Sequence, residues 1–149
     1  MKTEPTPQET AVTVAQPQPP AVFGGWLGPQ DHWHSYDGEG LDRARFVSRC
    51  TNEETIPLKD AVGEVLTIAH YFAHMVPINQ DDGSSVLAPR VVFETIDGVL
   101  YSSVSTGVAR GLQALFRELG DSLGKEKIRI RPVKKKAKRG DFVSFVVEG

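Results

Sequence analysis

The sequence is short of features that mark a membrane protein, a secreted protein or a disulfide-stabilised domain. It has one cysteine, Cys50, so no internal disulfide can form. No stretch approaches the roughly 18 apolar residues of a membrane-spanning helix, and residues 1–10 lack the apolar core of a signal peptide. We expect a cytoplasmic protein, and 40% hydrophobic residues among 149 suffice for one folded domain.

Catalytic and metal-binding motifs are also scarce. His70 and His74 have the spacing of a helical zinc pair, but the segment HYFAH lacks the glutamate of a metalloprotease. His32 and His34 have carboxylates nearby, yet they fall in a segment that we expect to be mobile. No glycine-rich loop with a lysine is present to cradle phosphates. We predict no enzyme activity, no cofactor and no metal site.

Positive charge is scarce until the last part of the chain. Residues 125–149 hold nine lysines and arginines against three acidic residues, a net of +6 in a chain whose total is −2. Because a polyanion releases counterions when cations bind it, such a concentration is typical of a nucleic-acid site. The cations assigned to this site are Arg129, Arg131, Lys134, Lys135, Lys136, Lys138 and Arg139.

The pattern of this basic segment predicts a β-hairpin. In KIRIRPV the isoleucines alternate with cations, and DFVSFVVEG has the aromatic and β-branched density of a second strand. The intervening KKKAKRG predicts a loop, with Gly140 free to adopt an unusual backbone angle. The alternative to a nucleic-acid site is a solvated hairpin whose lysines protect a sheet edge from aggregation.

The composition of residues 1–41 predicts a disordered, Pro/Gln-rich tail. Residues 42–149 are expected to form a folded domain. Four aromatic residues lie among glycines in the later part of this tail, Phe23, Trp26, Trp33 and Tyr36. They are expected to dock either on a partner or on the edge of the domain. The segment 41–50 allows either a short helix or an extra strand.

The residue pattern of the folded domain predicts a mainly β protein with one helix. Residues 61–78 favour a long strand, 79–85 a loop, and 90–105 a hairpin that turns at Asp97-Gly98. Thr106 can cap a helix that ends at Gly120 and buries one apolar face. The order β-β-β-α-β-β predicts an OB-fold, a five-stranded Greek-key barrel that commonly binds oligonucleotides. An α+β sandwich is the rival.

Three stretches of the domain also resemble a known family. They are TIPLKDAVGEVLTIAHY, APRVVFETIDGVLYSSVSTGVARGLQALFRELG and KIRIRPVKKKAKRGDFVSF, within residues 50–149. Together they are similar to the small OB-fold single-stranded DNA-binding proteins of bacteriophages and related mobile elements. The resemblance implies sequence-independent coating of single-stranded DNA during replication or recombination in a bacterial host cell.

Such binding needs cations for phosphates and aromatic rings on which bases stack. Tyr71 and Tyr101 are the candidate stacking residues, since their hydroxyls favour a partly wet site. Arg90 is a candidate additional phosphate contact. Phe93, Phe142 and Phe145 are expected to pack in the core.

Two other functions stay open at this point. The basic hairpin and the N-terminal aromatics could serve a protein adaptor, which would include contacts with replication proteins. RNA is an equal candidate ligand, because phosphate contacts and stacking do not require a particular sugar. Self-association is also left open, and no membrane partner is expected.

Overall fold

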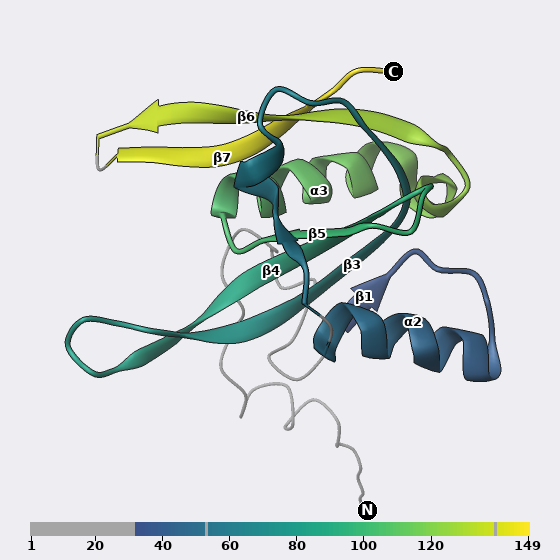
Figure 1. Ribbon diagram of the computed structural model, residues 1–149, viewed down its shortest axis with the longest axis horizontal. Coiled ribbons are helices and arrows are strands. Elements are labelled where there is room, and N and C mark those ends of the chain that lie inside the picture. The colour runs from purple at the N-terminus through teal and green to yellow at the C-terminus, as the bar shows by residue number, and fades with distance from the viewer. Residues whose placement is uncertain (1–31, 53, 139) are drawn as a thin grey trace, which may run out of the picture.

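The computed structural model describes residues 32–52, 54–138 and 140–149. They form a mixed α/β domain in which one curled sheet carries a helix on each side (Figure 1). The strands are β1 (His32–His34), β2 (Ile56–Pro57), β3 (Leu66–Asn79), β4 (Ser85–Thr95), β5 (Leu100–Ser103), β6 (Ile128–Ala137) and β7 (Gly140–Val147). The helices are α2 (Gly40–Asn52) and α3 (Thr106–Leu119), with 3₁₀ turns η2 (Leu58–Ala61) and η3 (Gly120–Gly124). No described helix is long and apolar enough to cross a bilayer.

The sheet is a half-barrel with the order β2-β5-β4-β3-β6-β7. β3 pairs with β4 along most of its length, while its other edge pairs first with β6 and then with β1. The predicted order of three strands, a helix and two strands is confirmed. The predicted closure into a barrel is wrong for the described residues, because β7 does not pair with β5.

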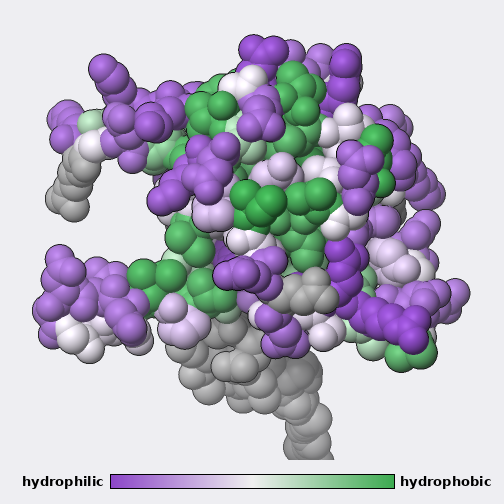
Figure 2. All heavy atoms as spheres, in the orientation of Figure 1, coloured by the Kyte–Doolittle hydropathy of each residue, from purple (hydrophilic) through white to green (hydrophobic). Residues whose placement is uncertain are grey.

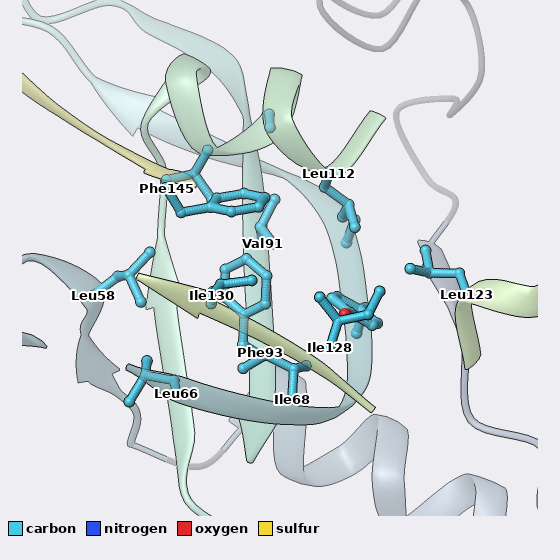
Figure 3. Packing of buried hydrophobic residues seen from close by; sticks show 14 of the residues in the cluster. Leu58, Leu66, Ile68, Val91, Phe93, Leu112, Leu123, Ile128, Ile130 and Phe145 are labelled. Carbon is cyan, nitrogen blue, oxygen red and sulfur yellow. The ribbon is translucent and has the colours of Figure 1, made fainter. Parts of the chain in front are cut away.

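Both faces of the central strands are buried, and each belongs to a separate apolar cluster. Side chains alternate between the two faces of a strand. Tyr71, Phe93 and their neighbours face the main core, which α3 covers (Figure 3). Phe72 and Val92 face the other way, where α2 buries them under Phe46. Residues 41–50 therefore belong to helix α2 and do not form an extra strand. This helix adds a layer over the sheet that the sequence did not predict.

Local signals position α3 and the turns as expected. The helix begins one residue after Ser105, whose hydroxyl accepts a hydrogen bond from the Gly107 amide at 3.1 Å. The capping residue is thus Ser105, not Thr106. Gly120 ends the helix, and the β4–β5 turn has Gly98 at a φ of 84°, a conformation that glycine adopts without strain.

The N-terminal segment 1–41 is described only from His32 onward, and that part is folded. β1 pairs with β3, the Trp33 ring packs edge-on against Phe116 at 5.5 Å, and Tyr36 stacks on Phe46 at 4.9 Å. These two aromatics therefore dock on the chain's own domain, because they bury apolar surface there. Phe23 and Trp26 lie outside the described residues.

Candidate nucleic-acid interface

Two hairpins extend beyond the core as arms on the same side of the molecule (Figure 1). The β3–β4 arm has Asp81 and Asp82 at its tip, between the strands. The β6–β7 arm, called the cationic arm here, carries Lys134, Lys135, Lys136 and Lys138. Figure 2 shows the arms with hydrophilic ends and a space between them.

The cationic arm differs from the predicted loop. β6 continues through Lys134, Lys135 and Lys136 to Ala137, which pairs with Gly140. Lysines tolerate this position because the arm projects past the core, where neither face has to bury apolar side chains. The prediction of a loop over KKKAKRG was therefore wrong for the residues that β6 contains. Arg139 lies outside the described residues.

The strand geometry sets the direction of each lysine. Lys134 and Lys136 continue the face on which Ile128 and Ile130 are buried, whereas Lys135 lies on the opposite face with Arg131. All four lysines of the arm are exposed. Among the described residues, no ion pair joins any of them to a carboxylate. Their charge is thus available to an anionic ligand.

A hollow lies against the start of β7, along the seam where β7 does not pair with β5. Its volume is about 540 Å³, and its walls come from η2, from the link between β5 and α3, and from the start of β7. A second hollow of about 410 Å³ continues from it toward Lys134. Lys59, Asp141, Phe142 and Val143 line both. The seam therefore opens toward the cationic arm.

The comparisons with known proteins identify the family. Residues 48–147 match the profile described as Phage Single-stranded DNA-binding protein. The chain belongs to this family. It therefore binds single-stranded DNA in phage replication, as the sequence predicted. No curated protein and no solved structure matches the chain significantly. β1 and most of α2 precede the matched residues.

Three of the residues predicted to bind DNA, Tyr71, Tyr101 and Arg90, are buried or half-buried in the domain. Tyr71 has no exposed surface, and its hydroxyl has no hydrogen-bond partner among the described residues. The expectation that Tyr71 offers a partly wet stacking surface is corrected by this position, and burial raises the pKa of its hydroxyl. Tyr101 is half-buried on β5 and packs against the main core.

Arg90 makes its contacts inside the protein. Its guanidinium donates to the Cys50 carbonyl at 2.8 Å and to the Thr55 hydroxyl at 3.3 Å, and it lies 3.1 Å from Nε2 of His74. Burial lowers the pKa of Arg90. These contacts hold the end of α2 against β4. The geometry therefore does not support the predicted contact between Arg90 and a phosphate.

Arg129 and Arg131 are exposed at the base of the β6–β7 hairpin, away from its tip. The Arg131 guanidinium pairs with Glu148 at 3.3 Å. Sequence reasoning missed two residues that the structure brings to the hollow, Lys59 and Phe142. Lys59 had no basic neighbours in the sequence to mark it, and Phe142 looked like the packing residues Phe93 and Phe145, which are indeed buried.

Helix α2 covers the outer face of the middle strands and is hydrogen-bonded to them. Arg49 on α2 donates to Glu94 at 2.6 Å and to the Gly98 carbonyl at 3.0 Å. Nδ1 of His70 lies 2.7 Å from the other oxygen of Glu94, and this hydrogen bond, with that from Arg49, lowers the pKa of the Glu94 carboxyl. The outer face of β3, β4 and β5 is thus covered around Phe72 and Val92.

Proposed function

We propose that single-stranded DNA follows the cationic arm and the adjoining hollows, with phosphates on the arm lysines. The observation that carries this proposal is the position of Lys134, Lys135, Lys136 and Lys138 on a projecting hairpin without carboxylate partners among the described residues. Contacts to phosphates carry no sequence information. The strand is therefore bound without regard to sequence.

The sheet face that α2 covers also supports a DNA path along the cationic arm. In OB-folds, oligonucleotides commonly cross the middle strands and reach the loops at either side. We interpret this fold as an OB-fold with an unclosed seam, in which α2 covers part of the middle-strand face. The arms and the seam remain accessible, so the DNA path is displaced toward them. Arg131 and Arg129 would extend the positive surface toward the base of the hairpin.

The family and the proposed site together support one biological role. The protein coats single strands in the cytoplasm of a bacterial host during phage replication or recombination, without catalysing a reaction. Contacts of the N-terminal segment with replication proteins and self-association are further parts of this proposal, and they require separate measurements of protein association. RNA is the alternative ligand, which the titration below tests.

The test is a titration of labelled single-stranded DNA, RNA and duplex DNA at several salt concentrations. Replacing Lys134, Lys135, Lys136 and Lys138 together with Ala should weaken binding to single-stranded DNA. It should also flatten the dependence of log affinity on log salt by roughly 0.7 for each lysine that contacts a phosphate. Thermal unfolding should hardly change, since all four side chains are exposed.

A charge-matched control separates location from net charge. Arg43, Arg45, Arg117 and Lys125 are four exposed cations on α2 and around the end of α3, away from the arms in Figure 1. Their replacement with Ala should preserve the salt dependence. Equal effects of the two variants would show a general charge effect and refute the site. Weak binding to all three nucleic acids by the unmodified protein would favour a protein adaptor.

A further inference from the structure

Phe142 differs from the other aromatic residues of the domain. Of the phenylalanines, tyrosines and tryptophans that the structure describes, it alone is exposed, at 36% of its surface. It lies on the cationic arm and lines both hollows. Single exposed apolar side chains are common on protein surfaces. An aromatic ring beside exposed lysines, however, is the combination that binding of a single strand of DNA needs.

The position of the ring is defined by a glycine on the neighbouring helix. A Cβ at Gly107 would lie 2.9 Å from two ring carbons of Phe142, so only glycine allows the ring to rest this closely on α3. One side of the ring is thereby supported. A ring that is held before the ligand arrives loses little conformational entropy on binding.

We infer, on the basis of the proposed function, that the seam hollow is a subsite for one nucleobase of the bound strand, which stacks on Phe142. The base enters between β5 and β7, where Ser102, Ser103 and Thr106 line the hollow on the side of β5 and α3. The Ser102 hydroxyl bonds to Thr55 and the Ser103 hydroxyl accepts from the Ser105 amide, but a hydroxyl has one donor and two acceptor positions, so capacity remains for the polar edge of a base.

Two lysines place phosphates near this base. Lys135 lies opposite Phe142 in the β6–β7 ladder, and Lys59 lines the hollow from η2. A base in a duplex is stacked and paired, so it reaches such a subsite only after leaving its partner. The subsite therefore gives a preference for single strands that cations alone do not provide.

The experiment compares two probes of equal length and charge, an oligothymidylate and an oligomer of abasic sugar phosphates. Phe142→Leu keeps an apolar side chain against Gly107 but removes the aromatic face. It should lower affinity for the oligothymidylate by about 5- to 150-fold, the loss expected for one base–aromatic stack. Affinity for the abasic probe and the salt dependence with both probes should not change. Phe142→Trp should retain affinity for the oligothymidylate.

The matched control is Val146→Ala, which truncates another exposed apolar residue on the same face of β7. It should bind both probes as the unmodified protein does, and thermal unfolding should confirm that each variant is folded. An equal loss with both probes, or no loss with either, would refute the nucleobase subsite. The proposed function fails separately, if the four-lysine variant keeps the affinity and salt dependence of the unmodified protein.

Discussion

Lys135 and Phe142 lie opposite each other in the β6–β7 ladder, so their side chains project from the same face of the cationic arm. A strand whose base stacks on Phe142 would bring a phosphate toward the Lys135 ammonium. The charge and the ring then act on the same nucleotide. This arrangement predicts that their contributions to binding depend on each other.

A double-mutant cycle tests this dependence. We expect Lys135→Ala and Phe142→Leu to show a coupling energy of about 0.5 to 3 kcal/mol in binding to single-stranded DNA, as neighbouring residues with a shared ligand do. Lys136 lies opposite Asp141 on the other face and supplies the control pair. Lys136→Ala and Phe142→Leu should be additive to within about 0.5 kcal/mol. Identical coupling for both pairs would contradict a shared nucleotide.

The hairpins and α3 could be predicted from the sequence because local chemistry decides them. Asp97-Gly98 specifies a tight turn, and the apolar positions of α3 follow one face. The layer formed by α2 could not be predicted. Residues 68–75 are apolar or aromatic on both faces because one side meets α3 and the other meets α2. A single sequence shows that both faces are apolar but not which element covers each.

The same limit applies to the candidate site. The excess of lysines located the cationic arm, since charge is visible without a fold. Whether a given aromatic is buried depends on the register and on the second layer, so Tyr71 and Phe142 were assigned to the wrong environments. The tyrosine hydroxyl suggested a wet site, yet Tyr71 is enclosed by the core.

Replacing Tyr71 with Phe tests this corrected position. The Tyr71 hydroxyl is buried without a hydrogen-bond partner among the described residues, and its removal relieves a desolvation cost of about 1 to 3 kcal/mol. We expect Tyr71→Phe to unfold at the same urea concentration or a higher one. Its affinity for single-stranded DNA should equal that of the unmodified protein. A loss of affinity in the folded variant would return Tyr71 to the interface.

Ser105 joins α3 to β7 across the seam. Its hydroxyl donates to the Val143 carbonyl at 2.5 Å and accepts from the Gly107 amide at 3.1 Å. Ser105→Ala removes both hydrogen bonds and should lower the free energy of unfolding by about 0.5 to 2 kcal/mol, the range for loss of a helix cap. Urea denaturation measures this loss. Thr106→Ala, which removes an exposed hydroxyl at the next residue, provides the comparison, and an equal effect would contradict the proposed role of Ser105.

His74 makes the stability of the domain depend on pH. Burial, the Arg90 guanidinium and His32 lower the pKa of His74 from 6.5 to about 4, and its ring packs edge-on against Phe72 at 5.0 Å. His74 is therefore neutral in the folded protein at pH 7. As the pH falls below 6.5, the unfolded chain takes up a proton that the folded state does not, so stability decreases toward pH 4.

His74→Gln tests this dependence, because glutamine can accept a hydrogen bond from Arg90 but does not titrate. The melting temperature of the unmodified protein should fall as the pH is lowered from 6.5 to 4.5. The variant should show a smaller fall, with a remainder from His34, whose pKa burial also lowers. Glu94 contributes mainly below its ordinary pKa of 4.5, outside this window. Melting temperatures that fall in parallel for the two proteins would show that His74 does not cause the acid sensitivity.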